Sequence, residues 1–122
     1  PDADTQVVAA NKHPTEHDAG QCVHSDYFAT NWLSVQTARV MIPLALDLAG
    51  LYGQLLHCLL PLPAREQESL INLVMRIEHV AAKRREVEKA ESRLAREKQF
   101  NRKVEINATL RQLRAELEQM SS

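Results

Sequence analysis

Glycine and proline are absent from the second half of this chain. All three glycines and all five prolines precede residue 64, so the 59 residues from Ala64 to Ser122 contain neither. Both residue types interrupt helices, because glycine adds backbone freedom and proline removes an amide donor. The stretch is rich in Glu, Lys, Arg, Ala and Leu. It predicts a long helix over about 66–120, which we expect to be continuous or gently bent rather than folded back as a hairpin.

Aromatic residues are also scarce, at 4% of the chain. A core of Leu, Val, Ile and Ala suits helix packing better than a sheet enzyme. We therefore expect a mainly α protein with a long C-terminal coiled-coil-like helix, one buried helix and a short β-containing N-terminal remnant. No Gly-rich phosphate loop, Ser/His/Asp constellation or pair of catalytic carboxylates is recognisable. No catalytic residue or cofactor is predicted, and whether the chain is an enzyme stays open.

Cysteine is limited to Cys22 and Cys58, too few for a disulfide framework. The sequence opens on Pro1 without a signal-peptide pattern, which suggests a cytoplasmic protein and a fragment lacking its natural N-terminus. The Leu-rich segment 42–62 contains Asp47, two glycines and flanking prolines, so we do not expect it to span a membrane.

The chain divides by composition into three predicted parts. Residues 1–36 read as the strand and loop remnant of an upstream αβ domain, with strands near 5–10 and 21–27 and a loop at 11–20. Two strands cannot form a stable sheet alone. They must pack on helices or belong to a larger sheet.

Residues 37–63 are predicted to form a buried helix and a turn. Pro43 suits a first helical position, and the Pro-Leu-Pro sequence at 61–63 ends the helix. Apolar residues recur at spacings of four and three, and Cys58 falls on this face, so we expect its thiol to be buried and inert. The stripe comprises Leu44, Leu48, Leu51, Leu55 and Cys58, widened by Tyr52, Leu56 and Leu59.

Residues 64–122 are the predicted coiled-coil segment. One apolar series runs from Leu73 to Leu94 and a second from Ile106 to Met120. Twelve residues separate Leu94 from Ile106, which is not a whole number of heptads, so a stutter, a change of partner or a fold-back lies near residues 97–103. An apolar stripe on a long helix needs a partner, either elsewhere in the chain or on another copy, and we predict a protein partner or a homo-oligomer. The candidate interaction residues are Ile77, Val80, Val87, Leu94, Phe100, Asn101, Ile106, Leu110, Leu113 and Leu117.

Phe100 and Asn101 lie at the phase break. A helical-core Asn fixes register or partner choice at a cost in stability. Two interpretations stay open for this pair: a specificity element in assembly, or local packing against the chain's own helices.

Charge is unevenly distributed along the chain. Residues 1–63 carry net −4 and residues 64–122 net +3, with nine Lys/Arg and four Glu between 82 and 103. This segment is a candidate nucleic-acid-binding face. The alternative, which the spacings Glu86–Lys89 and Arg93–Glu97 favour, is a solvated helix face with intrahelical ion pairs. The candidate nucleic-acid contacts are Lys83, Arg84, Arg85, Lys89, Arg93, Arg96, Lys98, Arg102 and Lys103.

Four possible metal donors lie close together in sequence: His13, His17, Cys22 and His24. Zinc takes His and Cys ligands, but structural sites usually show spacings such as C-x₂-C, and only one Cys is present. A polar loop with incidental histidines is favoured, and no metal site is predicted.

Several strings carry a resemblance to a known family. They are the segments 97–107 (EKQFNRKVEIN), 46–52 (LDLAGLY), 59–63 (LLPLP), 25–28 (SDYF) and 31–33 (NWL). Together they resemble the C-terminal part of the bacterial family called domain of unknown function 4391, over most of residues 5–120. The resemblance implies longer members with an upstream αβ half, often encoded near helicases and DNA methyltransferases of restriction or defence clusters. It implies no known activity.

Two functions follow as expectations. The first is a helical assembly or scaffold module in a DNA restriction-modification or defence system. The alternative is an accessory nucleic-acid-binding protein using the basic face of residues 83–103. A third, weaker option places an enzyme in the upstream half, with this segment as its scaffold.

Overall fold

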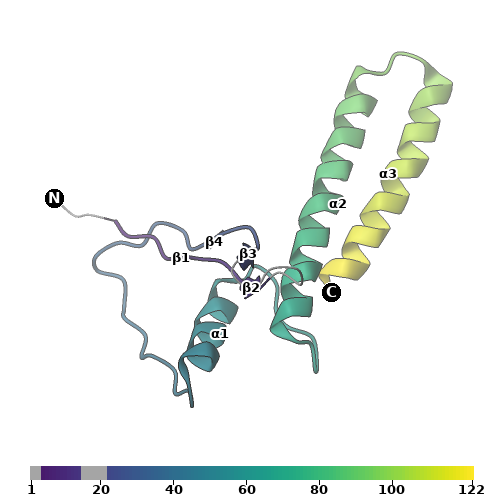
Figure 1. Ribbon diagram of the computed structural model, residues 1–122. Helices are drawn as coiled ribbons and strands as arrows, with labels where there is room; N and C mark the ends of the chain where they lie inside the picture. Colours follow the sequence, from purple (N-terminus) through teal and green to yellow (C-terminus); the bar gives the residue numbers. More distant parts are fainter. Residues whose placement is uncertain (1–3, 15–21) are drawn as a thin grey trace. The chain divides into compact units, whose positions relative to one another are not determined.

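The computed structural model describes residues 4–14 and 22–122 (Figure 1). The chain forms two compact units, Pro1–Val74 and Met75–Ser122, which we call the N-terminal unit and the hairpin unit. Three helices dominate, so the mainly α prediction is confirmed. The domain limits expected at residues 36 and 63 stay predictions.

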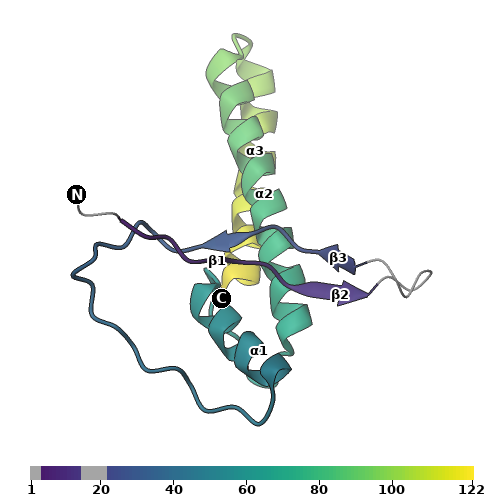
Figure 2. The same ribbon diagram turned by 60° about the vertical axis from the view of Figure 1, so that its left-hand side comes forward.

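The described part of the N-terminal unit contains an antiparallel β-ribbon, clearest in Figure 2. Its strands, in pairs, are β1 (Val8–Ala9) with β4 (Phe28–Ala29) and β2 (Lys12–Pro14) with β3 (Cys22–His24). β1 and β3 fall inside the predicted strands. β2 lies in the segment predicted as a loop, so that prediction is wrong for Lys12–Pro14. β4 was not predicted. β2 forms because it pairs with β3, and β4 forms because it pairs with β1.

The register of this ribbon slips by one residue twice. In each of two intervals, three residues along the first arm (residues 5–12) lie opposite four residues along the second arm (residues 24–33). The paired positions are Thr5↔Leu33, Val8↔Ala29, Ala9↔Phe28 and Lys12↔His24. Each interval therefore places one extra residue in the second arm, which is the geometry of a β-bulge.

Side-chain hydroxyls replace ladder bonds at both bulges. The Ser25 Oγ accepts the amide of Asn11 at 3.0 Å, and the Thr30 Oγ1 accepts the amide of Val7 at 3.2 Å. Ser25 is buried, and its Oγ also donates to the Asp26 carbonyl at 2.9 Å. The hydroxyls thus satisfy backbone groups that the slipped register would leave unpaired.

The first helix, α1, spans Leu48–Leu59. The prediction that it begins at Pro43 is wrong, because Asp47 caps it: its Oδ1 accepts the Gly50 amide at 2.7 Å. The expected end before Pro61 is confirmed. α1 contacts β1, and the Tyr52 hydroxyl donates to the Ala10 carbonyl at 2.6 Å. The ribbon is therefore held against a helix, one of the two arrangements expected.

Only one side of α1 is buried, and Leu56 lies at its centre. Cys58 is two residues further on, about 200° around the helix, and it is exposed. The prediction of a buried Cys58 thiol is therefore wrong. The helix buries the side carrying Leu56 and leaves Leu48 and Leu55 exposed.

The hairpin unit is built from α2 (Leu70–Arg96), whose first five residues belong to the N-terminal unit, and from α3 (Phe100–Ser121); the two helices lie side by side and antiparallel in Figures 1 and 2. The predicted continuous helix is wrong: it stops after Arg96 and the chain folds back within three residues. The Glu97 Oε1 accepts the amides of Lys98 and Gln99 at 2.8 and 2.9 Å. A side chain thus satisfies donors at the turn, so that a turn without glycine or proline is stable.

α2 also begins later than the expected residue 66. The Ser69 Oγ accepts the Asn72 amide at 3.2 Å, which places an N-cap directly before Leu70. Apart from this shift, a helix covers most of the predicted stretch on both sides of the turn.

The fold-back brings the two out-of-phase apolar series together in one seam. Ile77, Val80, Val87 and Leu110 are buried. Leu94, Ile106, Leu113 and Leu117 are half-buried. Three polar contacts fix the antiparallel register: Arg76 Nη1 to the Met120 carbonyl (3.2 Å), Lys83 to Glu116 (3.0 Å) and Arg114 to Glu91 (2.6 Å). The phase break at residues 97–103 therefore marks the fold-back, one of the three outcomes the sequence allowed.

Candidate nucleic-acid interface

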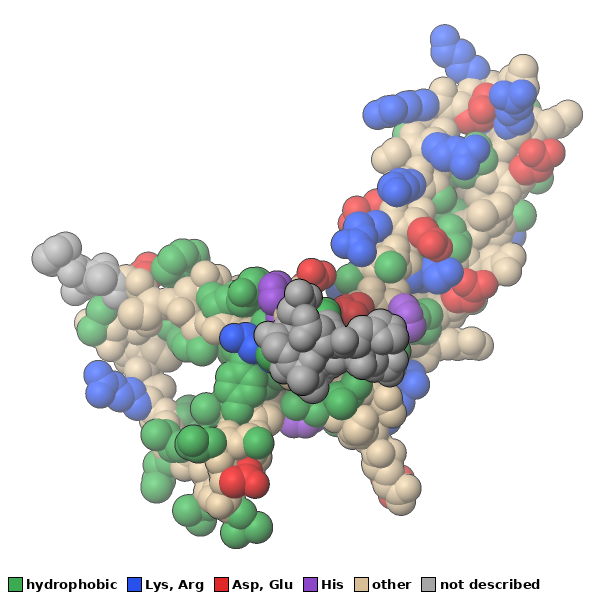
Figure 3. Space-filling model, viewed as in Figure 1, with side chains coloured by type: hydrophobic (Ala, Val, Ile, Leu, Met, Phe, Trp, Pro, Cys, Tyr) green, Lys and Arg blue, Asp and Glu red, His purple; other side chains and the backbone are tan. Residues whose placement is uncertain are grey.

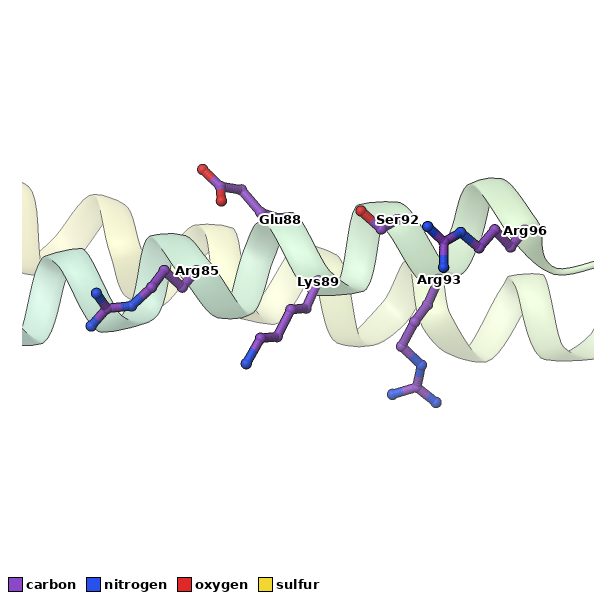
Figure 4. Close-up of a pocket in the computed structure, with 6 residues that line it drawn as sticks. All are labelled: Arg85, Glu88, Lys89, Ser92, Arg93 and Arg96. Atoms are coloured by element: carbon purple, nitrogen blue, oxygen red, sulfur yellow. The ribbon is translucent and has the colours of Figure 1, made fainter.

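Four of the predicted nucleic-acid contacts form a single row along α2. Arg85, Lys89, Arg93 and Arg96 follow one another at spacings of four, four and three residues, so they share one helix face about 16 Å long. All four are exposed. Figure 4 shows Lys89 and Arg93 extending to one side of α2, while Arg85 and Arg96 run along the helix. We call these four residues the basic face.

The basic face is turned away from the seam. At about 100° per residue, Leu94 lies about 180° from Arg85, and Val87 lies about 160° from Lys89. Val87 is buried and Leu94 is half-buried. The cations are therefore unavailable for packing inside the hairpin and project into solvent.

Three of the four acidic residues interleaved with this row are engaged elsewhere. Glu86 and Glu116 both pair with Lys83, at 3.1 and 3.0 Å, and Glu91 pairs with Arg114 of α3. The Glu97 carboxylate accepts the turn amides. The expected ion pairs Glu86–Lys89 and Arg93–Glu97 do not form.

No ion pair neutralises the basic face within residues 4–14 and 22–122. Glu88 and Ser92 line the same shallow surface, but Figure 4 shows both pointing away from the side taken by Lys89 and Arg93. Neighbouring cations repel one another unless an anion lies between them. The arrangement therefore suits an extended polyanion.

Lys83 and Arg84 stand apart from the basic face although they belong to the same sequence run. The hydrogen bonds from Lys83 to Glu116 and Glu86 raise the pKa of Lys83 and commit its ammonium group to the hairpin itself. Arg84 is exposed but lies about 100° around the helix from Arg85. Neither residue extends the row.

The remaining three predicted contacts, Lys98, Arg102 and Lys103, are exposed at the tip of the hairpin. Blue side chains crowd this tip in Figure 3. The pKa of Glu97 is lowered mainly by the amide of Gln99, with further contributions from the Lys98 amide and from the charges of Arg102 and Lys103. The tip thus continues the positive surface of α2.

Eight of the ten predicted interaction residues are buried or half-buried in the seam. The other two, Phe100 and Asn101, are exposed, and Phe100 keeps 78% of its surface. Local packing against the chain's own helices therefore does not account for Phe100. The interpretation of this position as a specificity element in assembly stays a prediction.

One exposed apolar surface was not predicted. The connection between β4 and α1, together with the first residue of α1, carries six apolar side chains that nothing in the described chain covers. They are Val40 (91% exposed), Met41 (91%), Ile42 (74%), Leu44 (97%), Leu46 (106%) and Leu48 (83%). We call this segment, Val40–Leu48, the apolar loop; green side chains gather over it in Figure 3. Its signal was the apolar run around Pro43, which was interpreted as the start of a helix.

The proposed metal donors are not brought together in the described residues. His17 lies outside them, while Cys22 and His24 are exposed. The His24 ring stands 5.3 Å from the Tyr27 ring, with Nδ1 2.9 Å from the Ser25 carbonyl. Among residues 4–14 and 22–122, no three His, Cys, Asp or Glu side chains are placed to share a metal ion.

Within the described residues, none of the helices combines the length and the apolar composition that crossing a membrane requires.

Comparison with known proteins identifies the family. The model of the family described as "Domain of unknown function (DUF4391)" matches residues 2–117, so the chain belongs to this family and the resemblance noted in the sequence is confirmed. Searches of curated proteins and of solved structures returned no match. Membership brings no activity with it, so function has to be argued from the surfaces.

Proposed function

We propose that the hairpin unit is a nucleic-acid-binding module and that the basic face of α2 contacts the phosphate backbone. The observation that carries this proposal is the row of four cations opposite the seam, which form no ion pair with any described residue. A protein that neutralises phosphates releases condensed counterions, which drives binding without regard to sequence. A role beside DNA-modifying enzymes fits the genomic setting that the family resemblance implies.

The chemistry of the basic face favours backbone contact over base reading. Long Lys and Arg side chains on an exposed helix face, without a neighbour to hold them in one geometry, match phosphates better than base edges. We therefore propose an accessory, sequence-independent binder.

Fluorescence anisotropy with labelled 20-nucleotide DNA, single-stranded and duplex, tests this role. The variant R85Q/K89Q/R93Q removes three charges and keeps good helix formers. We expect it to bind about tenfold or more weakly at low salt. The matched control K12Q/R39Q/R111Q removes three exposed charges elsewhere, and we expect it to stay within about twofold of the wild type.

Two results would contradict the proposal. One is the absence of binding by the wild type at low salt. The other is an equal loss in both triple variants, which would reflect net charge rather than the basic face.

A second candidate function is assembly through the apolar loop. The predicted assembly surface was the pair of heptad series, but the hairpin occupies those side chains internally. The apolar loop remains uncovered, and the Gln54 Nε2 fixes its middle by donating to the Leu44 carbonyl at 3.1 Å. Exposed apolar clusters commonly mark interfaces.

The size of the loop suits association with a second copy of the chain. Burying six such side chains contributes about 1.5–3 kcal/mol each. The sum exceeds the lower part of the estimated association cost of about 4–15 kcal/mol. We therefore propose a homodimer in which the loops cover one another.

Light scattering coupled to size-exclusion chromatography measures this association. We expect a wild-type dimer and a monomeric M41S/L44S/L46S variant. The control I71S/M75S/V104S removes three exposed apolar residues from α2 and α3 and should remain dimeric. A wild-type monomer at high concentration contradicts the assembly candidate and leaves the nucleic-acid proposal untouched.

A further inference from the structure

Phe100 has no structural explanation within the hairpin. It is the only aromatic residue of the hairpin unit, it begins α3, and it is 78% exposed. Leu110, at the centre of the seam, lies about 80° from Phe100 around α3, and Leu113 lies about 140° away. Val104, one turn further along the same face, is also 53% exposed. The phenyl ring is therefore open to solvent.

The surroundings of this ring are strongly positive. Residues 93–104 include five cations (Arg93, Arg96, Lys98, Arg102 and Lys103) and a single acid, Glu97. The Glu97 carboxylate is turned onto the amides of Lys98 and Gln99. The one negative charge among residues 93–104 is therefore held at the backbone of the turn, while the five cations are exposed.

We propose that the hairpin tip binds unpaired nucleotides, with Phe100 stacking on a base while the tip cations hold the flanking phosphates. This inference rests on the proposed function and specifies its ligand. An aromatic ring beside cations is the combination by which proteins bind single strands, because every base offers a π-face. In a duplex those faces are already stacked, so the ring gains a partner only where bases are unpaired.

The basic face and the tip then have separate roles. Arg85, Lys89 and Arg93 attract any polyanion along α2, and Phe100 discriminates between paired and unpaired strands. Two classes of variant should therefore behave differently, which makes the inference separable from the function on which it rests.

The test uses the full chain, fluorescein-labelled dT20 and a labelled 20-base-pair duplex. We expect F100A to weaken dT20 binding about tenfold and duplex binding by less than twofold. F100L, which keeps an apolar side chain without a π-face, should behave like F100A. F100Y, which keeps an aromatic ring, should bind dT20 like the wild type. The thermal midpoint of F100A should match the wild type, because the ring is exposed.

A spectroscopic readout supports the same distinction. In F100W, tryptophan fluorescence beyond that of the wild-type Trp32 background should be quenched by dT20 and not by the duplex. Stacking on a base produces this difference, whereas a purely structural role for position 100 does not.

Three results would overturn the inference. In the first, F100A binds dT20 as tightly as the wild type while R85Q/K89Q/R93Q loses binding, so that the proposed function stands without the stacking role. In the second, F100L equals the wild type, which indicates apolar contact rather than stacking. In the third, F100A loses binding to phosphatidylserine vesicles but not to dT20, which assigns the tip to a lipid surface.

Discussion

Lys83 of α2 and Glu116 of α3 form an ion pair across the hairpin, with 3.0 Å between Nζ and Oε2. Lys83 also pairs with Glu86 at 3.1 Å, and Glu116 also accepts from the Gln112 Nε2 at 3.1 Å. The hydrogen bond lowers the pKa of Glu116 and raises the pKa of Lys83. This network joins residues 33 positions apart in sequence and helps to set the register in which the two apolar series meet.

The ion pair makes hairpin stability depend on pH. Because the folded pKa of Glu116 lies below its unfolded value, its contribution is complete above about pH 4.3 and is lost as pH falls through the folded pKa. The pKa of Lys83 is raised in the folded state, so its contribution to stability is present at neutral pH. That contribution is lost only as strongly alkaline pH rises through the folded pKa. We expect E116Q to lower the thermal midpoint by a few degrees at pH 7 and by nothing measurable near pH 2.5.

Circular dichroism at the two pH values measures this effect. E88Q is the matched control, because Glu88 is exposed and forms no ion pair within the described residues. It should leave the midpoint unchanged at both pH values. A deficit of E116Q that persists unchanged at pH 2.5 would show that the charge of Glu116 is not its cause.

The seam should contain most of the stability of the hairpin. Leu110 is 4% exposed, so L110A leaves a cavity and should cost about 2–4 kcal/mol in urea unfolding. V104A, on the exposed part of the same helix, should cost less than about 0.5 kcal/mol. Equal effects of the two substitutions would contradict the antiparallel packing.

The bulge at Ser25 should be sensitive to loss of its hydroxyl. S25A removes a buried group that accepts from the Asn11 amide and donates to the Asp26 carbonyl, at an expected cost of about 1–2 kcal/mol. Hydrogen exchange at the Asn11 amide should accelerate. S34A, which removes an exposed hydroxyl accepting from Gln36, serves as the control. Unchanged protection of Asn11 would contradict the bulged register.

The Cys58 thiol should react in the folded protein. It is exposed on α1, with only a long contact of 3.4 Å from Sγ to the Gln54 carbonyl. In a C22S background, we expect one thiol to react with Ellman's reagent at the rate of the unfolded chain within about tenfold. A thiol that reacts only after urea is added would contradict the exposed position of Cys58. It would support the buried position that the helical pattern of the sequence predicted.

Residues 64–122 show what a sequence predicts well and where it fails. The absence of glycine and proline correctly predicted helix on both sides of residue 98, and eight of the ten residues predicted to contact a partner lie instead in the seam within the hairpin. The fold-back was missed because a Glu side chain, rather than a glycine, satisfies the turn. The phase difference between Leu94 and Ile106 was the remaining signal, and it allowed three outcomes of which only packing selects one.

The candidate nucleic-acid interface was also predictable only in part from the sequence. The spacing of Arg85, Lys89, Arg93 and Arg96 is readable from the sequence, and so is their common face. The sequence does not reveal that these cations lack ion pairs within the described residues, because this depends on α3 supplying Glu116 to Lys83 and Arg114 to Glu91. Those partners become visible only once the hairpin register is known.

At the start of α1, the sequence carries two start signals, Pro43 and Asp47, and the prediction relied on the wrong one. Pro43 suits a first helical position, but Asp47 supplies the cap that the helix uses. The residues before it are left extended and apolar, so the apolar loop appeared only in the structure.

The salt dependence of single-stranded DNA binding tests the central claim most directly. The four phosphate contacts of the basic face contribute about −3 to the slope of the logarithm of the association constant against the logarithm of salt concentration, beside the contribution of the tip cations. R85Q/K89Q/R93Q should lose about two units of that slope, whereas K12Q/R39Q/R111Q should keep it. Parallel lines for the wild type and both triple variants would contradict the assignment of the basic face.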